Sequence, residues 1–378
     1  MRKTMIMVML AAVCGAGHSA NLTIPSFHLL TRGRLQGTLF VLQTEADIDV
    51  RIGGGYKFGG ELSLSVQTDN LEQPSIPGDT YDEAVVGAAL RERLYLSAAA
   101  VVIRDLFDAP LDVRYFVGRH TRILNGDLFP QEFGSRVIGS EYRGRLAFPT
   151  GTVYDGLHAV EGTGLVLTSS GLLPWLFLEA ALYQDAYLST GHYSADVRAA
   201  LNTRQFKAES FVGASYPGAP LGIYRGGLLL YYTTGPASEV FAQVGVPRWA
   251  PEPDGALNID DFYFLFEPRV HLGLVSAILT LFWHPEYYVQ APTAETGAMD
   301  INLKLVAGDR FEGILSGGID SAFRLRPAID DERLRIRVAP FITISSSGVV
   351  WDLRAAFTVL PFDLPSLFEA YVGVRTEF

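Results

Sequence analysis

Apolar and polar residues alternate along most of this chain, in blocks of roughly ten residues. The sharpest block is RLRIRVA, in which Leu334, Ile336 and Val338 alternate with three arginines. A period of two places successive side chains on opposite faces of a β-strand. Similar blocks occur at 47–52, 61–67, 111–117 and 300–306. Because no stretch after residue 20 keeps a helical period, the pattern predicts an all-β fold.

Two kinds of connection separate these blocks. Short ones such as KFGGE, TTGPAS and AGDR are rich in the residues that favour tight turns. Longer ones cover 69–84, 120–150, 247–258 and 321–332. Transmembrane β-barrels combine tight turns at one end with long loops at the other. A soluble β-sandwich or propeller also alternates, so the alternation alone does not decide between these folds.

Aromatic residues gather near the ends of several blocks and favour the barrel. In a membrane barrel the apolar face contacts lipid, and aromatic girdles lie at the two interfaces. The most apolar stretch, VHLGLVSAILTLFW, is interrupted by His271 and Ser276 and is followed by Pro285, so it does not suit a spanning helix. Only helices and closed barrels pair every backbone group inside lipid. If this chain crosses a membrane, it therefore crosses as a closed barrel.

The first twenty residues have the layout of a secretory signal peptide. Arg2 and Lys3 precede an apolar run, and small residues lead to Ala20. Cys14 raises the alternative of a lipidated cysteine, but the residue before it is Val13, where that processing favours something small. Without the leader the chain has no cysteine, so no disulfide stabilises it.

We therefore expect a single closed antiparallel transmembrane β-barrel in residues 34–378, after a signal peptide in 1–20 and a short periplasmic segment in 21–33. At about ten residues per crossing, the chain gives about 16 strands, with a range of about 14 to 18. The phrases DLFDAPLDVRYFVG and LPFDLPSLFEAYVG look like one strand-turn-strand motif. The strand count nevertheless places their turns at opposite ends, which indicates one miscounted hairpin.

The chain ends in AYVGVRTEF, an alternating strand in which Val372, Val374 and Thr376 share a face with the terminal Phe378. This strand resembles the terminal strand of bacterial outer-membrane β-barrel proteins, although Thr376 departs from the usual apolar preference. The resemblance implies insertion in the outer membrane, with membrane lipids and the assembly machinery as partners. It also implies an assembly signal formed by Tyr371, Val372, Val374 and Phe378. The phrases GRLQGTLFVLQTEADIDVRIGGGYKFGG and YDGLHAVEGTGLVL resemble uncharacterised spirochaete-type outer-membrane barrels.

The formal net charge of −11 argues against nucleic acid as a partner, because phosphate binding requires concentrated positive charge. No histidine belongs to a metal-binding pattern, so neither a metal nor another cofactor is expected. Asp260, Asp261 and His284 invite comparison with barrel enzymes, which carry Asp and His groups at the rim. No motif sets a nucleophile beside its base. We therefore expect no enzyme and interpret these residues as ordinary polar groups.

The polar face supplies the candidates for lining a pore. Three arginines form a basic ladder on one strand, and two aspartates form an acidic pair on another. Opposed charges across a pore tune which ions pass; pairing across the lumen to stiffen the barrel is an equally good interpretation. The pore-lining candidates are Arg333, Arg335, Arg337, Asp47, Asp49, Arg51, Asp112, Arg114 and Lys304.

The connection at 120–150 is long enough to fold into the lumen as a constriction, and it could equally cap the outside. Its charged residues are the constriction candidates Arg122, Asp127, Glu132, Arg136 and Glu141.

These features predict a porin-like outer-membrane channel for passive or weakly selective diffusion of small hydrophilic solutes. A first alternative is a transporter of hydrophobic substrates such as fatty acids, which requires an apolar lumen pocket and an amino-terminal plug. A structural or adhesin barrel without transport is a second. The sequence names no solute, and it leaves homo-oligomerisation open.

Overall fold

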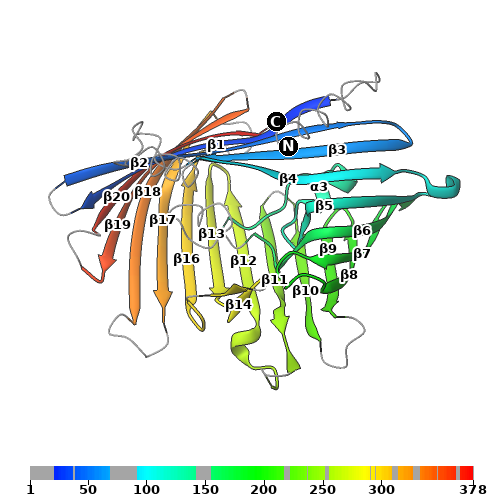
Figure 1. The fold of residues 1–378 in the computed structure, drawn as a ribbon. Helices are drawn as coiled ribbons and strands as arrows, with labels where there is room; N and C mark the ends of the chain where they lie inside the picture. Colours follow the sequence, from blue (N-terminus) through cyan, green and yellow to red (C-terminus); the bar gives the residue numbers. More distant parts are fainter. Residues whose placement is uncertain are drawn as a thin grey trace, which may run out of the picture.

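The computed structural model describes residues 21–36, 39–68, 92–141, 155–216, 222–235, 237–251, 255–289, 291–293, 295–308, 314–326, 333–346, 348–362 and 367–377. Strands dominate these ranges, which confirms the all-β prediction (Figure 1). No helix in the described part of the chain is long and apolar enough to cross a membrane. The predicted signal peptide lies outside the described residues.

Among the described residues, 18 strands form one sheet, and β14 and β15 form a separate two-stranded sheet. The first half of the sheet consists of β1 (Asn21–Gln36), β2 (Leu39–Gly54), β3 (Phe58–Thr68), β4 (Glu92–Ile103), β5 (Leu111–Ile123), β6 (His158–Leu173), β7 (Leu176–Asp185), β8 (Tyr193–Asn202) and β9 (Phe206–Ser215). The second half consists of β10 (Ile223–Thr233), β11 (Ser238–Trp249), β12 (Tyr263–Leu272), β13 (Val275–Trp283), β16 (Met299–Ala307), β17 (Leu315–Leu325), β18 (Leu334–Ser346), β19 (Val349–Leu360) and β20 (Phe368–Glu377). The remaining elements are η1 (Leu106–Asp108), α3 (Leu128–Phe133), η2 (Ile259–Asp261), β14 (Tyr287–Tyr288) and β15 (Ala291–Pro292).

Strands that follow one another in the chain pair antiparallel, and β13 pairs with β16. The first strand, β1, pairs with β2 on one side and with the last strand, β20, on the other. Ser26 lies opposite Glu377 in that last pairing. The hydrogen-bonded order therefore returns to its start, which is the connectivity of a barrel.

Two expectations need correction. The estimate of about 16 strands is too low, because the sheet of the described residues contains 18, the upper limit of the expected range. Turns as short as 174–175 and 273–274 join neighbouring strands, which leaves more of the chain for crossings. Residues 21–33 do not form a separate periplasmic segment, because they belong to β1 and pair with both β2 and β20.

Short and long connections lie at opposite ends of the sheet. The short-turn end carries 55–57, 174–175, 203–205 and 273–274, and the long-loop end carries 124–157, 250–262 and 284–298. The similar phrases at 105–118 and 360–373 do turn at opposite ends, the first between β4 and β5 and the second between β19 and β20. No hairpin was miscounted there, so the likeness of the two phrases does not reflect equivalent positions.

Strand direction changes strongly around the sheet. In Figure 1, β1 to β5 run across the top of the view, whereas β10 to β13 run vertically. A right-handed rotation between neighbouring strands, accumulated over many strands, produces such a change.

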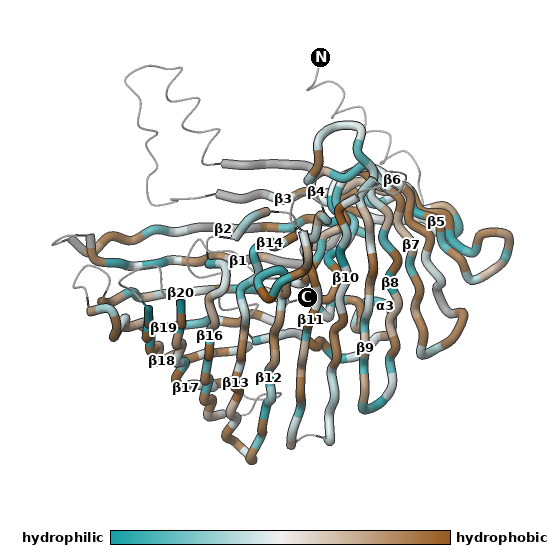
Figure 2. The backbone as a smooth tube through the Cα atoms, turned by 90° about the horizontal axis from the view of Figure 1, so that it is seen from below, coloured by the Kyte–Doolittle hydropathy of each residue, from teal (hydrophilic) through white to brown (hydrophobic). Residues whose placement is uncertain are grey.

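The burial pattern is the inverse of that in a soluble protein. In β7, Glu179, Tyr183 and Asp185 are buried, whereas Leu178 and Leu182 are exposed. Figure 2 shows hydrophilic and hydrophobic segments following one another along the strands. Other buried charged residues include Asp196, Arg198, Glu209, Arg225, Glu239, Glu267 and Arg269, and other exposed apolar residues include Val197, Val212, Tyr232, Val244, Phe264, Val270 and Leu303. A soluble sandwich would bury the second set, so this pattern excludes it and matches a barrel with a polar interior and an apolar exterior.

Candidate functional site

The connection between β5 and β6 turns into the barrel at its first residues. Asn125 and Asp127 stabilise the turn, since the Asn125 amide donates to the Asp127 carboxylate at 2.8 Å and accepts from its backbone N–H at 3.0 Å. Gly126, between them, has a φ of +89°, and a side chain there would collide with the Ile138 carbonyl. Only glycine meets both requirements without strain. The helix α3 follows at Leu128, and we call residues 124–141 the lumen loop.

Two glycines on the inner face of the sheet leave space for side chains of this connection. Gly227 in β10 and Gly245 in β11 are in register and both lack a side chain. A Cβ at Gly227 would lie 2.6 Å from the Leu157 side chain and 2.8 Å from that of Leu124. The two glycines therefore make room for leucines from both ends of the β5–β6 connection.

Apolar side chains of the lumen loop pack against the wall around these two glycines. Leu124, Leu128, Phe129 and Ile138 of the lumen loop are all buried. They belong to one cluster with inward-facing residues of the wall, namely Phe211, Leu229, Tyr231 and Phe241. The lumen loop therefore packs against the wall formed by β9 to β11.

Buried polar groups hold the backbone where the loop begins. The Leu124 N–H donates to Glu209 Oε1 at 2.8 Å, and the Leu124 carbonyl accepts from the Gln243 amide. Arg198 neutralises the same Glu209 carboxylate, with Nη2 at 2.7 Å from Oε1. Glu209 and Arg198 are almost fully buried, so this contact is protected from water.

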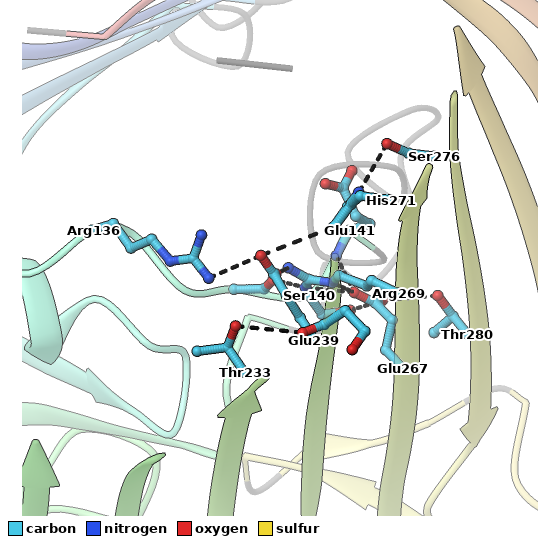
Figure 3. A network of polar contacts seen from close by, with 12 residues as sticks. Arg136, Ser140, Glu141, Thr233, Glu239, Glu267, Arg269, His271, Ser276 and Thr280 are labelled. Carbon is cyan, nitrogen blue, oxygen red and sulfur yellow. Dashed lines mark hydrogen bonds and ion pairs between the residues drawn. The ribbon is translucent and has the colours of Figure 1, made fainter. Parts of the chain in front are cut away.

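A second anchor holds the other end of the loop (Figure 3). Glu267 in β12 accepts from Ser140 Oγ at 2.7 Å and from the Glu141 N–H at 3.1 Å. Arg269, two residues farther along the same face, pairs with Glu267 at 2.6 Å and donates to the Gly139 carbonyl. A fully buried carboxylate and its arginine thus hold three consecutive loop residues.

Side-chain ion pairs add two further connections. Arg136 Nη2 lies 2.8 Å from Glu239 Oε1 in β11, and Lys304 Nζ in β16 lies 2.8 Å from Glu141 Oε2. Of the alternatives that the sequence left open, the geometry favours a loop folded into the barrel over one that caps it.

The other constriction candidates lie along the same connection. Arg122 pairs with Asp155 at 3.6 Å, where the connection leaves and re-enters the wall. Asp127 belongs to the entry turn, and Glu132 in α3 is exposed. All five predicted charged residues therefore fall on the lumen loop or at its base.

The predicted basic ladder lies on the inward face of β18. Arg337 pairs with Glu369 and with the Tyr371 hydroxyl of β20. Arg335 is exposed, and so is Arg333 just before the strand. The ladder thus becomes more exposed toward the long-loop end.

The remaining pore-lining candidates lie on β2, β5 and β16. Asp49 accepts a hydrogen bond from Ser65 across β2 and β3, and Arg51 is exposed. The side chain of Asp47 lies outside the described residues. The partners of the others are Glu61 for Arg114, the Asp105 N–H for Asp112 and Glu141 for Lys304.

The predicted assembly signal divides between two faces of β20. Val372 is exposed and lies on the outward face with Val374. Tyr371 is buried on the inward face, and Phe378 lies outside the described residues.

Two regions of the interior differ in exposure. On the side covered by the lumen loop, the Arg198 side chain is 2% exposed, whereas Arg337 on β18 is 28% exposed. A hollow opens on that second side, lined by Asp320, Ala322, Arg337, Ala339, Arg354, Ala356 and Tyr371. We infer that the accessible part of the lumen follows β17 to β20.

Glu132, a carboxylate of the lumen loop, has a raised pKa. Its side chain is exposed, yet the surrounding protein partly desolvates it and raises its pKa, and the Glu179 carboxylate raises the pKa further. On acidification Glu132 therefore loses its negative charge at a higher pH than an ordinary glutamate. For ion passage through the barrel, we expect the permeability of cations relative to anions to fall early in an acid titration, and we expect Glu132→Gln to remove that first step.

Reversal potentials under a salt gradient, recorded as the pH is lowered, measure this effect. Glu161→Gln, at a glutamate that pairs with exposed Arg119 away from the loop, is the control. Identical profiles for Glu132→Gln and the unmodified protein would show that Glu132 does not face the ion path.

Sequence reasoning missed the residues that hold the loop. Glu209, Gln243, Glu267 and Arg269 were not singled out, because each looks like an ordinary polar position on an alternating strand. One signal was present, namely an inward Glu and Arg two residues apart in FEPRV. Two opposite charges on one face of one strand neutralise each other. The carboxylate lone pairs and guanidinium N–H groups that this pairing does not use can still bind a third partner.

The residues considered for enzyme chemistry have other partners. Asp261 accepts from the Asn258 N–H at 2.6 Å and caps η2, and His284 lies 3.0 Å from Asp300. Within the described ranges, no group of three or more His, Cys, Asp or Glu residues could hold a metal ion.

A ring of antiparallel strands with a polar interior, an apolar exterior and an inward-folded loop is the fold of transmembrane β-barrels. Solved structures of this fold match nearly the whole chain. OccK11 of Pseudomonas aeruginosa has a TM-score of 0.51 and 12% identity, covering 93% of this chain and 95% of that one. Wzi of Escherichia coli, described as an outer membrane protein involved in group 1 capsule assembly and a carbohydrate-binding β-barrel, has a TM-score of 0.50 and 12% identity, covering 99% and 87%. At this identity the similarity concerns the fold alone.

OprB of Pseudomonas putida also matches, with a TM-score of 0.43 and 10% identity over 98% of this chain and 95% of that one. No protein-family model matches the sequence. No curated protein matches it either.

Proposed function

We propose that this protein is an outer-membrane channel through which small hydrophilic solutes diffuse passively or with weak selectivity. The observation that carries the proposal is the lumen loop, which is held inside a barrel of polar interior by buried carboxylates at both of its ends. A loop fixed at two points narrows the lumen without sealing it. The partly exposed charges of β17 to β20 then line the path that remains.

The charge arrangement supports discrimination between ions. Arg335 lies directly opposite Arg324 in the register of β17 and β18. Like charges that face each other across strands are destabilising. Asp300 and Glu295 pair with Arg324, whereas no ion pair of Arg335 is found among the described residues. Positive charge therefore accumulates near the long-loop end of β18, where it favours anions.

The transporter of hydrophobic substrates is less well supported. That function requires an amino-terminal plug, and residues 21–33 are instead part of β1. The larger cluster of buried apolar residues inside the barrel packs against the lumen loop.

Conductance of the refolded protein in a planar lipid bilayer tests the proposal. We expect discrete steps of conductance that are stable in time. Correct folding is shown by a migration on gels that changes when the sample is boiled. A correctly folded sample without conductance steps would contradict the proposal and favour a structural barrel.

Neutralising the basic ladder provides a residue-level prediction. We expect Arg333→Gln, Arg335→Gln and Arg337→Gln together to shift the reversal potential toward cation preference, because three positive charges leave one side of the path. The control is a variant that removes three positive charges elsewhere, Lys57→Gln, Arg119→Gln and Arg204→Gln, all at exposed positions away from the lumen loop. Equal shifts in the two variants would assign the effect to net charge alone.

A further inference from the structure

Three arginines surround one tyrosine on the inner face of the sheet, where the last strand pairs with the first. Tyr371 in β20 lies opposite Arg354 of β19 on one side and opposite Arg32 of β1 on the other. Residues directly opposite each other in an antiparallel pair share a face, so both arginines lie on the inner face with Tyr371. The third is Arg337 of β18, whose guanidinium carbon lies 5.6 Å from the centre of the Tyr371 ring. We call these four residues the seam site.

Two of the arginines have carboxylate partners and still keep unused N–H groups. Arg337 donates from Nη2 to Glu369 and to the Tyr371 hydroxyl. Arg354 donates from Nη1 to Asp320 at 3.2 Å, and its Nη2 lies 3.5 Å from a second carboxylate. Among the described residues, Nε and Nη1 of Arg337 and Nε of Arg354 have no partner. A guanidinium group only donates hydrogen bonds, so the site offers donors to an acceptor.

Arg32 has no counter-charge in the described part of the chain. It is 8% exposed, and its Nε is buried without a hydrogen-bond partner. Buried charges in proteins are normally paired, because removal from water disfavours a lone ion. Leu30, two residues away on the same face, packs against Tyr371 and two alanines of the hollow, so this face of β1 adjoins the hollow. An anion from outside the chain would supply the partner that Arg32 lacks.

The hollow beside Tyr371 has the size of one small group. Its volume is about 40 Å3, and Ala339 and Ala356 belong to its floor. Arg337 precedes Ala339 by two residues and Arg354 precedes Ala356 by two, so in the antiparallel pair the arginines flank the alanines from opposite ends. One water molecule needs roughly 10–15 Å3, so the hollow has room for about three atoms of that size. A carboxylate has three heavy atoms, and its two oxygens can accept from both sides.

We propose that the seam site binds the carboxylate of a small organic acid, with Arg32, Arg337 and Arg354 as its donors. The proposal rests on the proposed function and deepens it, because it names organic acids as the solutes that the channel favours. The planar fork of a guanidinium group matches the two oxygens of a carboxylate. The alanine floor leaves room for the carbon that carries the carboxylate.

Carbon-13 NMR of acetate labelled at its carboxyl carbon tests the proposal on the whole protein, folded in detergent micelles. Exchange of acetate with a slowly tumbling protein broadens the acetate signal, so a titration measures binding without any need for conductance. At constant ionic strength in chloride, we expect the broadening to saturate. Excess unlabelled propionate should reverse it, whereas acetamide, which has a similar shape and no charge, should not.

Substitutions assign the binding to the seam site. We expect Arg32→Gln and Arg354→Gln each to weaken acetate binding about tenfold, because a hydrogen bond to a charged group is lost. Arg32→Lys should bind with intermediate affinity, since it keeps the charge without the fork. Arg204→Gln removes the same charge from an exposed turn and should leave binding unchanged. A migration on gels that changes on boiling shows that each variant is folded, and Arg354→Gln serves alone if Arg32→Gln does not fold.

Four outcomes are decisive. Acetate binding that is unchanged in the folded arginine variants would overturn the proposal. Stronger reversal of the broadening by phosphate than by propionate would assign the site to a tetrahedral oxyanion and overturn its assignment to a carboxylate. Conductance steps from a protein that does not bind acetate would overturn this proposal and leave the channel. Acetate binding that requires Arg32, in a protein without conductance, would support the site and contradict the channel.

Discussion

Replacing residues 127–139 with a short glycine-serine linker is expected to raise the single-channel conductance several-fold and to weaken ion selectivity. The physical reason is geometric, because the lumen loop lies inside the barrel and the conductance of a narrow pore is set by its narrowest section. The change also removes Glu132 and Arg136, which are both exposed toward the interior. Recording in a planar bilayer under a salt gradient gives conductance and selectivity from the same channel.

The anchors explain why the loop should stay in place in the unmodified protein. A hydrogen bond to a charged group contributes about 1.5–3 kcal/mol. The loop has several of them, to Glu209 at its start and to Glu267 and Arg269 at its end. Together with the buried apolar contacts of α3, these bonds oppose any motion out of the lumen. We therefore expect steady conductance rather than frequent closures.

A second variant keeps the whole chain and tests the same idea. Arg136→Ala, Ser140→Ala and Lys304→Ala remove tethers of the distal half of the loop and leave Glu209 intact. We expect greater current noise in the open state, because fewer contacts then hold that half of the loop, chiefly those of Glu267 and Arg269 with its backbone. The control for the loop deletion replaces residues 186–192 with the same kind of linker. This connection lies at the same end of the barrel and its hydrogen bonds stay within β6 to β8, so its replacement should change neither the conductance nor the ion selectivity. If the loop deletion yields a folded barrel of unchanged conductance, the narrowest section lies elsewhere.

The pattern of the sequence predicted strands where alternation is uninterrupted. The block at 333–339 lies at the start of β18, and the block at 300–306 lies within β16. The first strand was missed because of a register shift between Thr23 and Ser26. A bulge adds a residue on one strand, so the period of two breaks at that point. Past the bulge, Leu29 and Leu30 are adjacent in the sequence, so the period of two is not evident in the rest of 21–33 either.

The candidate site was predictable only in part. The length and charge of the connection at 120–150 indicated a loop with a function, but length does not determine whether a loop folds inward. That direction depends on residues far away in the sequence, above all Gly227 and Gly245, which accommodate the leucines of the connection. A glycine on a strand has many explanations, and only the register of β10 and β11 shows that these two share one place.

A similar arrangement supports the wall beside the loop. Asp196 in β8 and Arg225 in β10 both lie in register with Gly213 in β9. Arg225 donates to both oxygens of Asp196, from Nε at 2.8 Å and from Nη2 at 2.9 Å. A side chain at Gly213 would collide with the Asp196 carboxylate, so the pair reaches across the middle strand only because that residue is glycine. The hydroxyl of Tyr183 also donates to Asp196, at 2.7 Å.

Arg225→Leu is expected to lower the free energy of unfolding by about 3–5 kcal/mol, because it leaves the buried Asp196 carboxylate without its counter-charge. The double variant Asp196→Leu with Arg225→Leu should recover most of that loss, since two apolar residues need no partner. Gly213→Ala keeps both charges and should still destabilise the protein, because the added methyl group separates them. Urea unfolding from lipid vesicles, followed by the mobility of the folded band on gels, measures all three. A double variant as unstable as Arg225→Leu would show that shape, and not the uncompensated charge, determines the stability of this part of the wall.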